Sequence, residues 1–196
     1  MKVVEVDPDL DEHIASIDAD EPRSPGVHLS SVIKLIETTQ GRLKGRDDLD
    51  DANSGKWKPY RVVGFLIERV FRELLKLLGL VKMGEICLDG IYMTPDYLDA
   101  QRWQLHEFKC TWRSWTGDIE DFWSWLTQVK GYCKALGILE AQITVLFVNG
   151  NYKPRVPMIK AFHITFEQWE LDENWAMILN WARSLQTMED NNGREL

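Results

Sequence analysis

The chain has 196 residues, enough for one sizeable domain, and its 44% hydrophobic and 28% charged residues are ordinary for a globular protein. No apolar run approaches the roughly 20 residues of a membrane span, and the N-terminus lacks a basic-then-apolar signal peptide, so we expect a cytoplasmic protein without membrane contact. The three cysteines are an odd number without a CxxC pair, which argues against a disulfide framework or a four-cysteine metal site.

The net charge of −8 is concentrated at the N-terminus. Residues 1–21 hold eight acidic side chains against one lysine, a balance of −7, which leaves −1 for the rest of the chain. The body is therefore near neutral, and local basic patches can still face a phosphate backbone. The acidic total does not exclude a nucleic-acid enzyme.

The patterns in residues 1–78 indicate an arm, two helices and a loop between them. Residues 1–26 are acidic and proline-containing with little apolar periodicity, which is typical of a flexible arm. Apolar residues at helical spacing predict a first helix at about 30–38 and a long one at about 59–78. Glycines and charges of alternating sign between them, in residues 40–58, indicate a loop.

The period then changes, and strands are predicted in two pairs. Residues 85–93 and 103–111 suggest two strands around a turn. Residues 141–148 and 158–166 form a second β-rich pair around another turn.

Two further helices complete the pattern, at about 118–136 and 167–185, and a polar tail at 188–196 is expected to fray. The order helix–strand–strand–helix–strand–strand–helix predicts an α/β fold, with a mixed central sheet flanked by helices on both faces. Residues 27–187 would form this single domain.

Two carboxylates and a lysine lie in the first strand pair. Glu107 and Lys109 point to one face because side chains alternate along a strand, and a turn near residue 98 would place Asp89 opposite Glu107. Such a cluster in a covered sheet is costly without a partner, and a hard divalent cation is a natural one. Phosphodiester hydrolysis fits this arrangement. The alternative is a solvated ion pair on an edge strand.

Three further elements of the sequence weaken that alternative. Glu68 interrupts an apolar run on the long helix, where a surface position is the alternative. Gln128 and Tyr132 share one helical face at i, i+4 spacing, where a core-edge pair is the alternative. Thr111 and Arg113 place a hydroxyl and a cation at the end of the strand that carries Glu107.

Together these residues resemble the PD-(D/E)XK nuclease superfamily, in its RecB-like and phage exonuclease branch. The ordered motifs lie within about residues 28–148 and read Gly64/Glu68, Gly84/Asp89, Glu107-Phe108-Lys109 and Gln128/Tyr132. The resemblance implies a restriction-endonuclease-like core and a metal-dependent deoxyribonuclease.

The resemblance also implies residue roles. Catalysis would rest on Asp89, Glu107 and Lys109. Mg²⁺ or Mn²⁺ would be bound by Glu68, Asp89, Glu107 and Phe108. DNA binding or bracing of the site would fall to Gln128, Tyr132, Thr111 and Arg113. His28, in a short His/Ser motif, is a further candidate, and a helix-cap position is its alternative.

Two departures from the family pattern matter. The literal Pro-Asp of the superfamily name occurs at Pro95-Asp96, but Asp89 is preferred because its Asp-Gly context lies within an expected strand, whereas Asp96 lies in a turn-rich segment. The cysteines that hold the iron–sulfur cluster of some relatives are absent, so no cluster is expected.

The leading hypothesis is an exonuclease, or a nuclease that processes ends or single strands, in recombination, repair or phage DNA metabolism. Trp112, Trp115 and Tyr132 would stack on unpaired bases. Core packing is expected for five other tryptophans, at positions 123, 125, 169, 175 and 181.

Two alternatives stay open: a structure-specific or site-specific endonuclease with the same core, and a non-catalytic DNA-binding or assembly module. No helicase motor fits in this chain, so a helicase or recombination partner would be a separate protein. A homo-oligomer is compatible with the sequence, and a phage-encoded chain would act in the host cytoplasm.

Overall fold

The computed structural model describes residues 23–41, 70, 79–111, 118–148 and 157–192. Several predictions therefore lie outside the described residues: the acidic arm up to residue 22, nearly all of the loop at 40–58 and of the long helix at 59–78, and the candidates Glu68, Trp112, Arg113 and Trp115.

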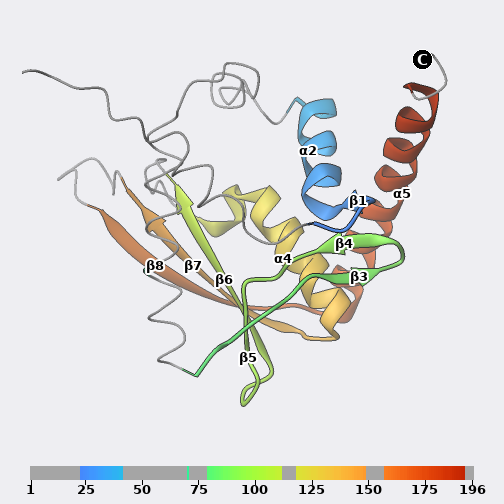
Figure 1. Cartoon of the computed structure of the whole chain (residues 1–196). Coiled ribbons are helices and arrows are strands. Elements are labelled where there is room, and N and C mark those ends of the chain that lie inside the picture. Colours follow the sequence, from blue (N-terminus) through green and yellow to red (C-terminus); the bar gives the residue numbers. More distant parts are fainter. Residues whose placement is uncertain (1–22, 42–69, 71–78, 112–117, 149–156, 193–196) are drawn as a thin grey trace, which may run out of the picture.

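The described strands form two sheets (Figure 1). The smaller sheet has the order β1-β4-β3, with β1 parallel to β4 and β3 antiparallel to it. Its strands are β1 (Val27–His28), β3 (Ile86–Leu88) and β4 (Ile91–Met93).

The larger sheet has the order β2-β5-β6-β7-β8, and only its β6–β7 pair is parallel. Its strands are β2 (Val81–Lys82), β5 (Tyr97–Asp99), β6 (Gln104–Thr111), β7 (Glu140–Phe147) and β8 (Met158–Thr165). Parallel neighbours need a crossover, and the helix α4 (Trp123–Leu136) supplies it between β6 and β7.

The predicted helices within the described residues are confirmed. Helix α2 spans Leu29–Thr39, and a 3-10 turn, η2 (Ile119–Asp121), precedes α4. Gly137 ends α4 in the left-handed conformation that favours glycine, with φ +66°.

Helix α5 differs from its prediction in where it ends and in which of its tryptophans are buried. It spans Gln168–Asn192, so the first part of the predicted tail at 188–196 is helical. Trp169, expected in the core, lies in its first turn and is 60% exposed, whereas Trp175 is buried. Within the described residues, no helix is long and apolar enough to cross a membrane.

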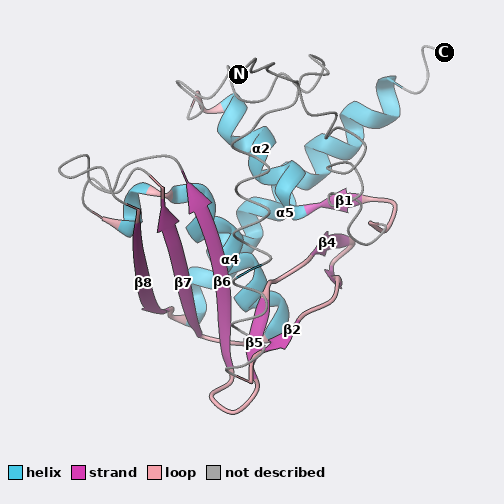
Figure 2. Cartoon of the chain, turned by 60° about the vertical axis from the view of Figure 1, so that its left-hand side comes forward, coloured by secondary structure: helices cyan, strands magenta, loops and turns pink. Residues whose placement is uncertain are grey.

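The helices α2, α4 and α5 lie on the same side of the five-stranded sheet, and α4 lies directly behind its central strands (Figure 2). The core forms between these layers from side chains that are almost fully buried, among them Val32, Leu105, Ile143, Val145 and Ile178. Two salt bridges tie α4 to α5, Lys130–Glu170 at 3.2 Å and Lys134–Asp172 at 2.6 Å. The predicted α/β class, with mixed sheets flanked by helices, is confirmed. The prediction of helices on both faces is not met by the described helices, which lie on one side of the larger sheet.

The prediction of one strand over residues 85–93 is wrong, because this segment is itself a hairpin. Strands β3 and β4 pair with Leu88 opposite Ile91, which leaves Asp89 and Gly90 as a two-residue turn. Both have positive φ, 50° and 80°, as a type I′ turn requires. An Asp-Gly dipeptide between apolar runs favours this turn, so the dipeptide taken as part of a strand marks its end.

Candidate active site

A cavity of about 240 Å³ lies where the β1–α2 junction, the β4–β5 connection, β6 and α4 meet. Its charged and polar lining side chains include Arg23, His28, Asp96, Glu107, Lys109, Gln128 and Tyr132. The alternating pleat of β6 points Glu107 and Lys109 to one face of the sheet, as the sequence predicted, and that face is the one that α4 covers.

Asp96, rather than Asp89, lies beside Glu107. Strands β5 and β6 pair with Tyr97 opposite His106, so the next position along the hairpin sets Asp96 opposite Glu107. The backbone N–H of Asp96 donates to Glu107 Oε2 at 3.4 Å, and the backbone N–H of Phe108 donates to Asp96 Oδ2 at 2.8 Å. The two carboxylates are thus locked together by the hairpin backbone.

A hydrogen-bonded chain of side chains continues from this pair to α4. Lys109 Nζ donates to Glu107 Oε1 and to Gln128 Oε1, both at 2.7 Å. The Gln128 amide nitrogen in turn donates to the Tyr132 hydroxyl at 2.6 Å. The predicted association of Glu107, Lys109, Gln128 and Tyr132 is therefore present, with the lysine held from two sides.

The electrostatics of the cavity oppose an ionised Glu107. Its side chain is only 3% exposed, and burial together with the neighbouring Asp96 raises the pKa of Glu107 to about 8, although the Lys109 ammonium acts to lower it. Burial and the same two carboxylates also raise the pKa of Tyr132 well above its usual value. The phenol is therefore neutral, and an added cation would relieve the repulsion between the carboxylates.

The expectation that Asp89 faces Glu107 is wrong. Asp89 lies in the β3–β4 turn and is exposed, and its Oδ2 accepts a hydrogen bond from Trp175 Nε1 at 2.8 Å. The assumed turn near residue 98 fails because the chain turns twice, at residues 89–90 and at 100–103. Asp89 therefore ties the small sheet to α5, and it does not line the cavity.

His28 lines the cavity, and its ring nitrogens contact two neighbouring loop residues. Its Nε2 lies 2.9 Å from the Ser24 carbonyl oxygen, and its Nδ1 lies 3.7 Å from Glu85 Oε1. It is also the N-cap residue of α2, although its side chain makes no capping bond. Thr111 is the last residue of β6, and its backbone carbonyl accepts a hydrogen bond from the Val148 backbone N–H at 2.9 Å. It is not among the residues that line the cavity.

The donor set suits a divalent cation in part. Two carboxylates in one cavity match Mg²⁺, which is usually bound through one or two carboxylates and several waters. Among the described residues, no group of three or more histidine, cysteine or acidic side chains could hold a metal ion. The third predicted carboxylate, Glu68, lies outside those residues.

Two signals in the sequence could have led directly to Asp96. The Asp89-Gly90 dipeptide favours a hairpin turn, which removes Asp89 from the strand next to β6. The second signal is the Pro95-Asp96 dipeptide itself, which the β5–β6 register places beside Glu107. The cavity residues Arg23 and Tyr92 carried no such signal, because they come from segments that only the tertiary fold brings together.

No protein-family model and no curated protein matches this chain. Solved structures do match in fold. A phage-related exonuclease from Haemophilus somnus 129PT is 18% identical, with a TM-score of 0.53 over 86% of this chain and 97% of that one. An alkaline exonuclease (LHK-Exo) from Laribacter hongkongensis is 14% identical, with a TM-score of 0.56 over 87% and 92%.

A third structure, of the protein SSO0001, has a TM-score of 0.57 at 11% identity, over 92% of this chain and 84% of that one. The phage-related and alkaline exonucleases belong to the PD-(D/E)XK nuclease superfamily. The fold that the sequence resemblance implied is therefore confirmed.

Proposed function

We propose that this chain is a divalent-metal-dependent DNA nuclease whose catalytic residues are Asp96, Glu107 and Lys109. The observation that carries the proposal is the cluster of these three side chains in one cavity, with Glu107 buried and Lys109 bonded to it at 2.7 Å. A buried carboxylate with a strongly raised pKa beside a second carboxylate is typical of a functional site. The fold of two exonucleases supports the same chemistry.

The proposed cofactor is Mg²⁺ or Mn²⁺, held by Asp96 and Glu107. Such an ion, when bound, polarises a phosphoryl oxygen and lowers the pKa of a water molecule. The ion would also compensate the repulsion that raises the Glu107 pKa. Glu68 and Phe108 remain proposed members of the same site.

The side chains of the protein supply position and charge. Lys109 would orient the attacking water and offset the negative charge that develops on the phosphoryl group. Gln128 accepts a hydrogen bond from the lysine and so fixes its ammonium above β6, while Tyr132 fixes the amide of Gln128. This support matters because a small displacement of a catalytic group costs rate steeply.

The finer proposal is an exonuclease, since two of the three structural neighbours are named as exonucleases. DNA is the proposed substrate, and exonuclease activity requires a free end. An endonuclease with the same core would cut covalently closed circles, and a non-catalytic binding module would cut nothing.

The test is incubation with labelled linear, closed circular and single-stranded DNA, each with Mg²⁺, Mn²⁺ or EDTA. Linear DNA should be degraded only with metal, and circles should survive. Lys109→Met should lower the rate by roughly 10²-fold or more, as loss of a charge-stabilising group does, without loss of Mn²⁺ binding. Lys134→Met is the matched control, because Lys134 pairs with Asp172 on the α4–α5 surface. Cleavage in EDTA, or a Lys109→Met variant as fast as wild type, would contradict the proposal.

A further inference from the structure

The tip of the β5–β6 hairpin carries an exposed tryptophan in an unfavourable backbone conformation. Trp103 is the last of the four residues between β5 and β6. Its large apolar side chain is 56% exposed. Its φ is +54°, in the left-handed region that bulky residues rarely adopt. In the part of the chain that the structure describes, no hydrogen bond or ring contact involves Trp103.

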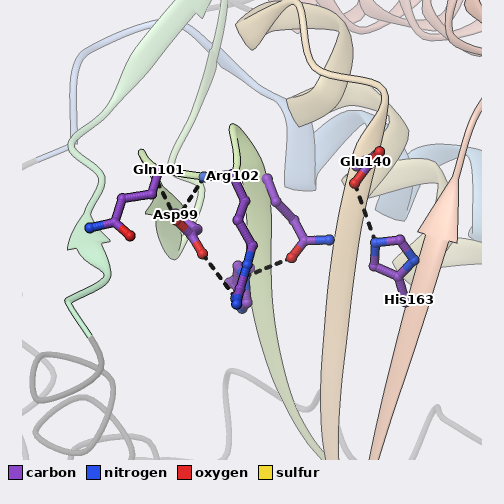
Figure 3. Close-up of polar contacts among 7 residues, drawn as sticks. Asp99, Gln101, Arg102, Glu140 and His163 are labelled. Carbon is purple, nitrogen blue, oxygen red and sulfur yellow. Dashed lines mark hydrogen bonds and ion pairs between the residues drawn. The ribbon is translucent and has the colours of Figure 1, made fainter.

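The turn that holds this ring is braced by hydrogen bonds (Figure 3). Asp99 Oδ1 accepts the backbone N–H groups of Gln101 at 2.9 Å and Arg102 at 3.0 Å. The Arg102 guanidinium lies 3.4 Å from the other carboxylate oxygen. These bonds lower the pKa of Asp99, and the bond from the Arg102 backbone N–H has the largest effect. The ring is thus presented on a turn held by side-chain-to-backbone hydrogen bonds.

Neither feature stabilises the fold. The positive φ strains the backbone, and the exposed ring leaves apolar surface in water. Glycine or asparagine would fill the same position without strain. A strained residue that persists at an exposed site indicates a role in binding.

The hairpin links this tip to the cavity. Asp96 immediately precedes β5 and Glu107 lies in β6, so the two strands that position both carboxylates are joined by the turn at residues 100–103 (Figures 1 and 2). Trp103 is the last residue of that turn. Glu107 lies four positions after Trp103, on the order of 13 Å at the usual strand rise. About four nucleotides span this length at the duplex spacing of about 3.4 Å per nucleotide.

We propose that Trp103 stacks on an unpaired base of the DNA strand that enters the cavity, while Arg102 contacts a phosphate beside it. This inference rests on the proposed function. Arg102 precedes Trp103 in the same turn and its side chain is 78% exposed, and a cation and an aromatic ring on one surface are typical of single-strand binding. A stable protein interface needs about 800 Å² on each partner, which one narrow turn does not offer, whereas a base stack needs one ring.

The test is fluorescence anisotropy in EDTA, which prevents cleavage, with two labelled strands of equal length: oligo(dT) and an abasic strand. Trp103→Ala and Trp103→Gly should weaken oligo(dT) binding roughly 10-fold, in line with the loss of one stacked base, and leave abasic binding unchanged. Trp103→Phe should retain most of the affinity. Trp169→Ala is the matched control, because Trp169 is similarly exposed on a different element and should have no effect.

Thermal unfolding separates this role from a structural one. Trp103→Gly should melt at the wild-type temperature or up to about 4 °C above it, because glycine relieves the strained φ. A lower melting temperature would show that the ring packs and would overturn the inference. Equal losses on both strands, no loss on oligo(dT), or a change in sedimenting mass without a change in DNA affinity would also overturn it. If the wild-type protein bound neither strand, the proposed function itself would fail.

Discussion

Glu107 is a carboxylate placed where ionisation is unfavourable, and this makes stability depend on pH. The unfolded chain would ionise it near its ordinary pKa of 4.5, whereas the folded protein holds the pKa at about 8. The folded state therefore binds this proton more tightly, and stability falls as pH rises between these two values. The shift corresponds to at most about 5 kcal/mol.

We predict that the melting temperature of the metal-free protein falls from pH 5 to pH 8. The melting temperature of Glu107→Gln should fall much less over the same range. Mn²⁺ should stabilise the wild type more at pH 8 than at pH 5, because ligands must be deprotonated to bind it. Calorimetric unfolding of both proteins with and without Mn²⁺ measures this. Parallel pH profiles for wild type and Glu107→Gln would contradict the assignment.

The cysteines show what residue type alone predicts at this scale. Their odd number argued against a disulfide framework, but their burial differs from one to the next: Cys87 is exposed, Cys110 half-buried and Cys133 buried. Burial raises the pKa of the Cys133 thiol to about 12, so this residue is an inert part of the core. Exposure of Cys87 follows from the β3–β4 hairpin, which the strand prediction missed.

At the scale of elements, α4 positions the site through one face. Gln128 and Tyr132 lie one turn apart, and their shared face was predictable from the i, i+4 spacing alone. Their contact with Lys109 was not, because it depends on how α4 crosses over β6 and β7.

We predict that Tyr132→Phe slows cleavage roughly 10-fold, the equivalent of one lost hydrogen bond, because the amide of Gln128 is then free to rotate away from Lys109. Affinity for Mn²⁺ should stay unchanged, since neither side chain belongs to the proposed ligands. Single-turnover rates and a Mn²⁺ titration of the variant separate the two effects. A rate equal to wild type would show that Gln128 holds its orientation without the phenol.

The β3–β4 hairpin shows why one element was mispredicted. Apolar residues at alternate positions favour a strand over residues 85–93, and that periodicity is real on both arms of the hairpin. The turn between them needs only Asp89 and Gly90, and a two-residue turn barely interrupts an alternating pattern. Because one extra turn shifts every later pairing, the error moved the expected partner of Glu107 from Asp96 to Asp89.

At the scale of the whole molecule, the sequence predicted the class of fold and most of its layers. The helix α2, the α4 crossover and the β7–β8 hairpin follow from periodicity and from turn residues such as Gly137. Local patterns did not predict that β1, β3 and β4 form a separate sheet, because the β1–β4 pairing joins segments more than 60 residues apart. The cavity depends on this long-range pairing, because His28 of β1 and Tyr92 of β4 both line it, with ring centroids 5.8 Å apart.

The central claim is that Asp96 completes the site with Glu107 and Lys109, and that Asp89 has a structural role. The most direct measurement is the rate of Mn²⁺-dependent degradation of end-labelled linear DNA by two isosteric variants. Asp96→Asn should lose roughly 10²-fold or more in rate, because it removes a proposed metal ligand. Asp89→Asn should cut at nearly the wild-type rate, since the amide oxygen can still accept the bond from Trp175. An active Asp96→Asn beside an inactive Asp89→Asn would contradict the account.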